Sequence, residues 1–250
     1  MLSALRLKAT GLPVKGIAGE PLVLIHGWSG EGRYWDECGY IAALGHEFQL
    51  ILPDLRGHGD SDTPANRDFS DTAFASDIIA VLDDMGIDSA HMFGYSLGGW
   101  VVFELAAEYP SRVRSAVVGG AHPYEEDLTA LRGLTPAAIL GMWESLNVPL
   151  SDGSKRRLAT FDPEVLTSVV AADRVNQAKR LERLRMPCLM ICGTEDWRFN
   201  DMRRFAEGNA DCKFVALDGL DHLQAFLSTD RLVPPARDFI RAFVSKRVGS

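Results

Sequence analysis

Residues 91–100, HMFGYSLGGW, place a single serine between an apolar run and a segment of helical character. A chain that turns from a strand into a helix within one residue forces that residue into sparsely populated backbone angles. Gly94 and Gly98 stand two positions before and after Ser96, where they relieve the crowding of such a turn. The stretch therefore predicts a strand, a sharp turn that exposes the Ser96 hydroxyl, and a helix.

The same alternation of short apolar runs and longer amphipathic segments extends along much of the chain. Strands are predicted for residues 22–27, 49–54, 91–96, 114–120, 188–193 and 213–217, and helices for 72–85, 97–109 and 235–248. Most of the strands are apolar on both faces, as expected when helices cover both sides of a parallel sheet. The segments ALRLKA and LPVKGIA near the start favour an antiparallel hairpin at one edge. Together these patterns predict an α/β fold with a mostly parallel, doubly wound sheet.

The regular alternation stops between residues 122 and 185. Residues 127–146 and 162–184 both have helical patterns, and no credible strand separates them. We expect residues 122–185 to form a small helical cap, inserted into a core made of residues 1–121 and 186–250.

Composition restricts the classes of partner. The formal net charge is −8 and the basic residues are scattered, so binding to nucleic acid is not expected. Arg6 and Lys8 interrupt the opening where a signal peptide needs an apolar core, and no apolar run is long enough to span a bilayer. The four cysteines have neither disulfide nor zinc spacing, which favours a reducing compartment. The predicted location is cytoplasmic, without membrane contact, and no feature indicates the oligomeric state.

A serine is a poor nucleophile at neutral pH unless an imidazole removes its proton and a carboxylate orients that imidazole. Among six histidines, His222 stands out because it follows the last predicted strand, where a loop could overhang the same sheet edge as Ser96. Asp196 follows the strand at 188–193 and lies in a predicted loop at the same sheet edge. The order Ser96, Asp196, His222 is the order of serine hydrolases on this architecture.

Three other carboxylates remain alternatives to Asp196. Glu195 is its neighbour, whereas Asp218 and Asp221 lie close to His222 in sequence. Turn carboxylates such as Asp218 and Asp221 commonly cap helices or bind their own backbone, which is the role we expect for them.

The N–H of Leu97, at the start of the predicted helix, is the expected first donor to a developing oxyanion. No GxGxxG or phosphate-loop pattern occurs, so no cofactor is predicted. A metal site is conceivable at residues 54–62, where Asp54, His58, Asp60 and Asp62 cluster, but their spacing matches no common site. No metal is expected, and Asp54 and Arg56 are expected to brace loops.

Five segments in family order resemble the α/β-hydrolase family, of the serine-nucleophile, short-cap carboxylesterase or lactonase type. They are HGW at 26–28, PDLRGHGDSD at 53–62, GYSLGG at 94–99, GTEDW at 193–197 and GLDH at 219–222. The resemblance implies that the Trp28 backbone N–H is the second oxyanion donor. It also implies an acyl-enzyme, because related dehalogenases and epoxide hydrolases carry aspartate where Ser96 stands.

Substrate choice is expected to depend on the cap and the pocket wall. One face of the first cap segment is apolar, through Leu131, Leu134, Ile139, Leu140, Met142, Trp143 and Leu146. Candidate substrate contacts are Trp28, Tyr95, Trp143 and Trp197. The predicted substrate is a small-to-medium ester or lactone with an apolar part. Carbon–carbon bond hydrolysis, cofactor-free perhydrolysis, and a receptor role with vestigial hydrolysis remain alternatives.

Overall fold

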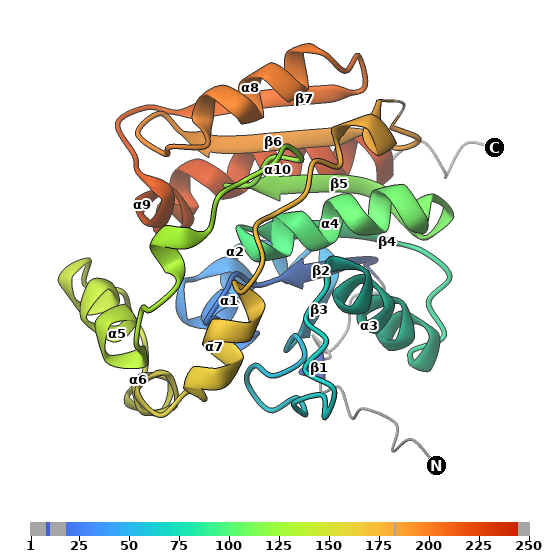
Figure 1. The fold of residues 1–250 in the computed structure, drawn as a ribbon. Helices are drawn as coiled ribbons and strands as arrows, with labels where there is room; N and C mark the ends of the chain where they lie inside the picture. The colour runs from blue at the N-terminus through green and yellow to red at the C-terminus, as the bar shows by residue number, and fades with distance from the viewer. Residues whose placement is uncertain (1–8, 11–18, 183, 245–250) are drawn as a thin grey trace.

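The computed structural model describes residues 9–10, 19–182 and 184–244, and its centre is a seven-stranded sheet (Figure 1). The strand order is β1-β3-β2-β4-β5-β6-β7, in which only β1 runs antiparallel to its neighbour. The strands are β1 (Ala9–Thr10), β2 (Glu20–Ile25), β3 (Phe48–Pro53), β4 (Ala90–Tyr95), β5 (Val113–Gly119), β6 (Cys188–Gly193) and β7 (Cys212–Leu217). The prediction of a mostly parallel α/β sheet is confirmed.

Helices cover both faces of this sheet, as its apolar strands require (Figure 1). One face is covered by α3 (Asp71–Asp84), α4 (Leu97–Glu108) and α8 (Phe199–Glu207), and the other by α1 (Arg33–Glu37), α2 (Tyr40–Leu44) and α10 (Thr229–Val244). A separate hydrophobic core lies on each face of the sheet, and alternate residues of a strand point into one core or the other. In β2, Val23 and Ile25 pack on the first face, and Leu22 and Leu24 pack on the second.

The predicted strands and the first two predicted helices agree with the structure to within about two residues. The last helix begins earlier than predicted, at Thr229 instead of residue 235, and contains Pro234 and Pro235. Burial of one face, including Leu232 and Ile240, offsets the two backbone hydrogen bonds that the prolines cannot make. The predicted end at residue 248 lies outside the described residues, as does most of the expected hairpin at the start of the chain.

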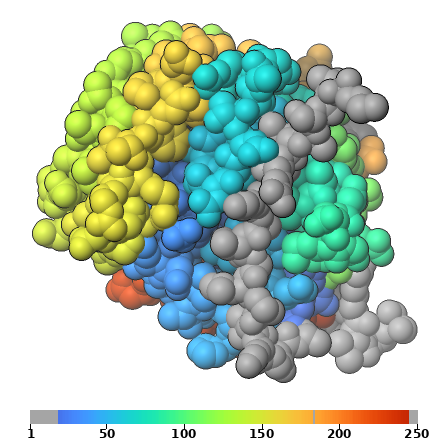
Figure 2. All heavy atoms as spheres, turned by 90° about the horizontal axis from the view of Figure 1, so that it is seen from below, coloured from blue at the N-terminus to red at the C-terminus, as the bar shows by residue number. Residues whose placement is uncertain are grey.

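The segment expected to form the cap lies between β5 and β6 and carries α5 (Pro136–Ser145), α6 (Asp152–Ala159) and α7 (Pro163–Val169). In Figure 2 its yellow-green to gold atoms lie directly against the blue and cyan atoms of the N-terminal part of the core. Short 3-10 turns occur at η2 (Thr129–Leu131), η3 (Ala178–Leu181) and, in the core, η1 (Pro110–Arg112).

Two predictions within this segment are wrong. Residues 162–184 were predicted to be helical, but the helix in this segment ends at Val169. The backbone that follows makes hydrogen bonds to residues 123–126 instead of continuing the helix. Arg174 and Glu126 exchange two backbone hydrogen bonds of 2.9 and 3.1 Å, and the Gln177 N–H donates to the Pro123 carbonyl at 2.7 Å. The pattern of residues 127–146 is helical only from Pro136, after the short turn η2. Helix α6 was not predicted.

Among the described residues, no helix combines the length and the apolar character needed to cross a bilayer. The four cysteines, Cys38, Cys188, Cys192 and Cys212, are buried and free. Burial, with help from the nearby Glu37 carboxylate, raises the pKa of the Cys38 thiol to about 12, so it stays protonated and unreactive near neutral pH.

Candidate active site

Ser96 occupies the turn between β4 and α4 with a φ of 56° and a ψ of −117°, a conformation that is rare for serine. Its N–H donates to the Gly119 carbonyl at 2.8 Å, which ties the turn to β5. A Cβ on Gly94 would lie 2.1 Å from the Gly98 carbonyl oxygen, and one on Gly98 would lie 2.0 Å from the Ile25 carbonyl oxygen. The turn is therefore possible only with glycine at both positions.

The loop after β2 lies against this turn. A Cβ on Gly27 would be 3.3 Å from Ser96 Cβ and 3.9 Å from Ser96 Oγ, so the Gly27 backbone lies beside the hydroxyl. Leu97, whose N–H is the expected first oxyanion donor, is the first residue of the 12-residue helix α4. Trp28, the expected second donor, follows Gly27 directly. Two backbone segments from different loops thus meet at Ser96.

His26 fixes the peptide group between Gly27 and Trp28. The Leu55 N–H donates to His26 Nε2 at 3.0 Å, so the ring proton is on Nδ1, which donates to the Gly27 carbonyl at 2.8 Å. The Gly30 N–H donates to the same carbonyl at 3.0 Å. Burial lowers the pKa of His26 to about 4, so the ring is neutral near pH 7. Because C=O and N–H point in opposite directions in a trans peptide, a fixed Gly27 carbonyl also fixes the Trp28 N–H.

His222 and Asp196 are joined directly, as the sequence predicts. His222 Nδ1 lies 2.6 Å from Asp196 Oδ2, and the Arg198 N–H donates to Asp196 Oδ1 at 3.0 Å. The Asp196 side chain is fully buried. Burial alone would raise the pKa of Asp196, but the His222 hydrogen bond and charge, together with Arg198, hold it below its usual value. An ionised Asp196 therefore accepts from Nδ1, so the lone pair of the neutral ring is on Nε2, which lies 3.5 Å from Arg198 Nη1.

Three neighbours position His222, two through the backbone and one against the ring. His222 is the first residue of α9 (His222–Leu227), and Asp221 caps this helix by accepting from the Leu223 and Gln224 N–H groups at 2.9 and 2.8 Å. The Tyr95 hydroxyl donates to the His222 carbonyl at 2.6 Å. Gly120, at φ 57°, lies so close that a Cβ there would be 2.6 Å from the His222 ring.

The alternative carboxylates occupy other places. Asp221 has the capping role expected of it, whereas Glu195 and Asp218 are exposed. The geometry therefore favours Asp196 as the partner of His222.

Ser96 and His222 line one pocket of about 310 Å³, although no hydrogen bond joins their side chains in the described part of the chain. All four aromatic residues predicted to contact substrate, Trp28, Tyr95, Trp143 and Trp197, line it too. The other apolar walls come from Leu131, Leu134, Ile139, Met142, Leu223 and Phe226. Leu140 and Leu146, from the predicted apolar face of the cap, pack on the core instead.

Arg198 lines the pocket as well, but it is not among the residues that the sequence predicts for the site. Its side chain is only 5% exposed, and Nη2 lies 2.6 Å from Glu126 Oε1, itself on an 8% exposed side chain. Nη1 lies 3.3 Å from His222 Nδ1, and the guanidinium stacks 4.3 Å from the centre of the Trp197 ring. The Glu126 carboxylate thus balances a cation beside the imidazole. No local pattern could connect Glu126 to Arg198, because 71 residues separate them in the chain.

The acidic segment at residues 54–62 forms a braced turn. Asp54 accepts from the Gly32 N–H at 2.7 Å and from the Asp60 N–H at 2.9 Å. Arg56 makes two hydrogen bonds to Asp77, of 2.6 and 2.7 Å. Across the described residues no group of three or more potential ligand side chains is arranged to hold a metal ion. Asp54 is thus engaged with the loop that carries Trp28.

Comparison with known proteins shows that the chain is similar to hydrolases. A family model described as the alpha/beta hydrolase fold matches residues 20–145, just over half of the chain. The pimeloyl-[acyl-carrier protein] methyl ester esterase of Aeromonas hydrophila subsp. hydrophila is 29% identical over 161 residues, which cover 64% of this chain and 60% of that protein. An esterase structure from Rhodococcus sp. ECU1013 superposes with a TM-score of 0.76 and 26% identity, over 96% of this chain and 95% of that one.

A third protein matches in fold alone. The enol-lactonase of Burkholderia xenovorans LB400 gives a TM-score of 0.78 over 95% of this chain and 96% of that one, at 20% identity. The architecture is thus shared over almost the whole chain.

Proposed function

The chain belongs to the alpha/beta hydrolase fold family, and from that premise we propose that it is a serine hydrolase of small-to-medium carboxylic esters or lactones. The observation that carries the proposal is the convergence of Ser96, on its strained turn, with the His222–Asp196 pair at one apolar pocket. A polar reactive group in a largely apolar cleft is the usual form of a small-molecule catalytic site. The likeness to two esterases supports the same reaction class.

In the proposed cycle Ser96 Oγ attacks the ester carbonyl carbon while His222 Nε2 takes the hydroxyl proton. The carbonyl electron pair moves to oxygen, and the Trp28 and Leu97 N–H groups stabilise the negative charge. His222 then gives its proton to the leaving alkoxide, and an acyl-enzyme forms. Water, deprotonated by His222, attacks the acyl carbon, so the acid leaves and Ser96 regains its proton. Asp196 keeps the imidazole oriented and stabilises its charged form.

The lining of the pocket favours a substrate whose acyl or alkyl group is mostly apolar. Leu131, Leu134, Met142 and Trp143 contribute its cap side, and a wall of this kind favours hydrocarbon surface over charge. We therefore propose uncharged esters and lactones of modest size as substrates. We also propose a cytoplasmic location, which the four buried, free cysteines support.

The test compares wild type, Ser96→Ala and Ser145→Ala on p-nitrophenyl esters of increasing chain length and on simple lactones. We expect steady turnover by wild type and by Ser145→Ala, because Ser145 is exposed on α5. Ser96→Ala should lose at least about 10⁴-fold in kcat. A fluorophosphonate should label Ser96 alone.

The same experiment separates the alternatives. A single turnover followed by a stable acyl-enzyme would indicate a receptor with vestigial hydrolysis. Turnover of a dienol ketone in preference to all esters would indicate carbon–carbon bond hydrolysis, and peroxide-dependent turnover would indicate perhydrolysis. Label on another serine, or full activity of Ser96→Ala, would overturn the proposal.

A further inference from the structure

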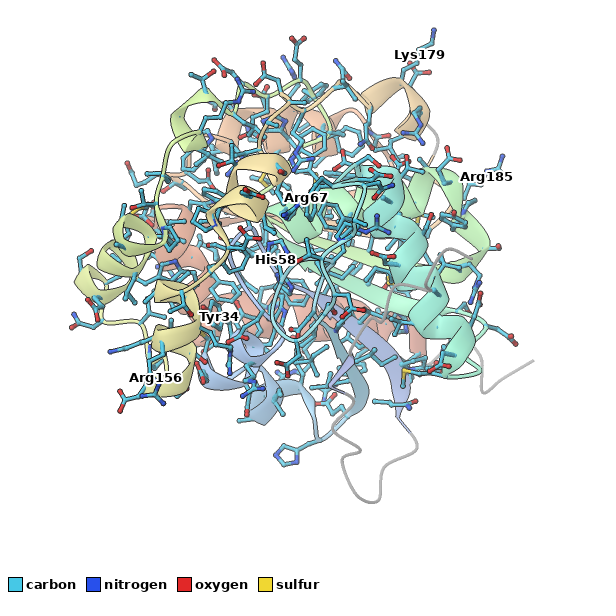
Figure 3. The ribbon with its side chains drawn as sticks, turned by 60° about the horizontal axis from the view of Figure 1, so that its bottom comes forward. Tyr34, His58, Arg67, Arg156, Lys179 and Arg185 are labelled. Atoms are coloured by element: carbon cyan, nitrogen blue, oxygen red, sulfur yellow. The ribbon has the colours of Figure 1, made fainter. Side chains whose placement is uncertain are left out.

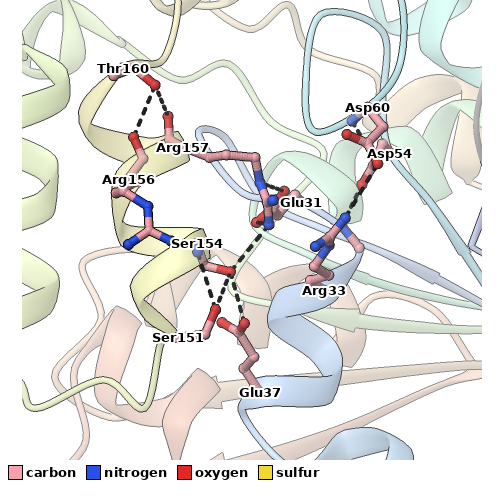
Figure 4. A network of polar contacts seen from close by, with 11 residues as sticks. Glu31, Arg33, Glu37, Asp54, Asp60, Ser151, Ser154, Arg156, Arg157 and Thr160 are labelled. Carbon is pink, nitrogen blue, oxygen red and sulfur yellow. Dashed lines mark hydrogen bonds and ion pairs between the residues drawn. The ribbon is translucent and has the colours of Figure 1, made fainter.

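The loop that carries the expected oxyanion donor is held by the cap at two points. We call residues 27–32 the oxyanion loop. The Trp28 indole Nε1 donates to the Leu166 carbonyl of α7 at 3.1 Å. Glu31 accepts from Arg157 of α6 through both carboxylate oxygens, at 2.7 and 2.8 Å (Figure 4). Two different cap helices therefore bind one short loop of the core.

The Glu31–Arg157 contact is strong because one partner is buried. The Glu31 side chain is 6% exposed, whereas that of Arg157 is 34% exposed. A bidentate pairing of guanidinium and carboxylate is the most favourable geometry for such an ion pair. The hydrogen bonds that Arg157 donates to Glu31 also raise the pKa of Arg157. If Arg157 were removed, the Glu31 carboxylate would be buried and unpaired, which is strongly unfavourable.

Arg157 is in turn anchored to the core through its own helix. Arg157 Nη2 lies 3.4 Å from Ser154 Oγ, and this fully buried serine donates to Glu37 Oε1 of α1 at 2.8 Å (Figure 4). The position of Arg157 therefore depends on how α6 docks on α1.

The oxyanion loop is buried, but it borders a second cavity beside the expected cap. This cavity of about 240 Å³ is lined by Ser29, Gly30 and Glu31 of the loop and by Arg157 and Phe161 of the cap segment. Tyr34 borders both cavities, and Figure 3 shows it at the junction between α1 and the cap. Ser29 also has a φ of 61°, which is strained for a non-glycine residue. Space and strain would both allow the loop to shift if its polar contacts were lost.

We propose that Arg157 is a positioning residue for the oxyanion hole. Its ion pair with Glu31 acts together with the hydrogen bonds that His26 and Gly30 donate to the Gly27 carbonyl. These contacts jointly hold the oxyanion loop in the conformation that aims the Trp28 N–H at the substrate oxygen, so full activity requires α6 to be docked. The proposal rests on the function proposed above, because it assumes that Trp28 stabilises an oxyanion. It adds that the cap controls the rate as well as the choice of substrate.

Loss of Arg157 should change catalysis more than substrate binding. Glu31 would draw water into the second cavity and pull the loop with it, while the apolar walls of the main pocket would remain. A displacement of about 1 Å of a catalytic group costs on the order of 100-fold, and loss of a whole oxyanion donor about 100- to 1,000-fold. For Arg157→Met we expect kcat to fall about 10- to 100-fold, with KM changed less than about threefold.

The test uses two inhibitors, of which only one forms an oxyanion when it binds. An alkyl trifluoromethyl ketone is attacked by Ser96 Oγ, the proton passes to His222, and the new oxyanion needs the Trp28 and Leu97 N–H groups. The methyl ketone with the same chain binds only through the pocket. Arg157→Met should weaken the trifluoromethyl ketone about 10- to 100-fold and the methyl ketone less than threefold.

Two variants serve as matched controls. Arg156→Met changes the neighbouring residue of α6, which is exposed and forms no ion pair among the described residues. Arg67→Met breaks a different contact between the core and the expected cap, in which Arg67 Nη2 lies 2.8 Å from Glu164 Oε2 of α7 (Arg67 is labelled in Figure 3). Both variants should keep wild-type affinity for the two ketones.

A rescue distinguishes positioning from a general loss of folding. Combining Arg157→Met with Glu31→Gln removes the unpaired carboxylate charge. We expect the double variant to recover at least half of the binding free energy for the trifluoromethyl ketone that Arg157→Met loses. Arg157→Lys keeps the charge without the bidentate contact and should give an intermediate loss. Equal losses for both ketones, an equal loss in Arg67→Met, or no loss in Arg157→Met would each overturn the inference. If wild type and Ser96→Ala bound the trifluoromethyl ketone equally, the proposed function itself would fail, whatever Arg157 does.

Discussion

At the residue scale, the most informative feature of the candidate site is Ser96, whose backbone conformation costs about 1–3 kcal/mol. Ser96 adopts it because its neighbours leave no alternative: the strand before it and the helix after it are both buried, and Gly119 accepts its N–H. Gly98 permits the close approach of α4 to β2, with the Ile25 carbonyl at its surface. The chain therefore uses glycine here for contact between backbones, in addition to turn formation.

Gly98→Ala should destabilise the protein by at least about 3 kcal/mol, because its Cβ would overlap the Ile25 carbonyl oxygen in a buried backbone. Gly141→Ala is the matched control, since Gly141 lies in α5 with open space around its Cβ position. That change should stabilise the protein by up to about 1 kcal/mol. Urea-induced unfolding measures both effects, and similar stabilities for the two variants would contradict the close contact.

Asp196→Asn should lower kcat about 10⁴-fold while leaving the fold intact, because the amide would favour the wrong tautomer of His222. Steady-state kinetics on an activated ester measures the loss. Glu195→Gln is the control, because Glu195 is exposed and does not line the pocket. A merely twofold loss in Asp196→Asn would transfer the role to Glu195, Asp218 or Asp221.

At the scale of elements, the loop between β6 and α8 is the second organising feature of the site. Its residues 196–198 supply the carboxylate for His222, the Trp197 ring beside it, and the cation that reaches across to Glu126. Glu126 belongs to the first residues of the cap segment and pairs its backbone with Arg174. The buried ion pair therefore links both ends of the expected cap segment to the loop that carries Asp196.

A double-mutant cycle on Glu126 and Arg198 should reveal this link. Each of Glu126→Gln and Arg198→Met should destabilise the protein by about 3–5 kcal/mol, since each leaves a buried group without its partner. The double variant should cost clearly less than the sum. Urea-induced unfolding gives the three values.

The control for this cycle is an exposed ion pair. Arg203 and Glu207 on α8 are 53% and 69% exposed, so Arg203→Met should cost less than about 1 kcal/mol. Additive losses at Glu126 and Arg198 would show that the two side chains stabilise the protein independently.

At the scale of the whole molecule, two buried cores lie on opposite faces of one sheet, and residues of the expected cap segment pack with both cores near its carboxyl edge. The buried polar groups near that edge make the stability depend on pH. Burial lowers the pKa of His26 to about 4 and of His58 to about 3, from 6.5 in each case. Both rings are therefore neutral in the folded protein down to pH values at which the unfolded chain is protonated.

Stability should consequently fall as the pH is lowered from about 7 toward 4. Between pH 6.5 and the folded pKa values the unfolded state binds more protons, so protonation favours unfolding. From pH 7 to 5 we expect each imidazole to reduce the free energy of unfolding by about 2 kcal/mol. Urea-induced unfolding at pH 7, 6 and 5 measures the slope. His58→Gln should flatten it, and an unchanged slope would contradict the buried, neutral state of His58.

Much of the architecture and the chemical core of the site could be predicted from the sequence. Strands, the serine turn and the pairing of His222 with Asp196 follow from local patterns, because in a parallel sheet every strand ends at the same edge. The residues Ser96, Asp196 and His222 each follow or end a strand, so their meeting is a consequence of topology. The apolar face of α5 was also visible in its helical spacing.

The sequence by itself thus determined which groups stand at the sheet edge and which chemistry they are suited to. Only the tertiary structure decided how the cap helices break, that Arg198 pairs with Glu126, and that Arg157 holds the oxyanion loop. These contacts join residues far apart in the chain, and a charged side chain carries no local sign of the partner that it will meet. Burial makes such pairings specific, because an unpaired charge in the interior is too costly to tolerate.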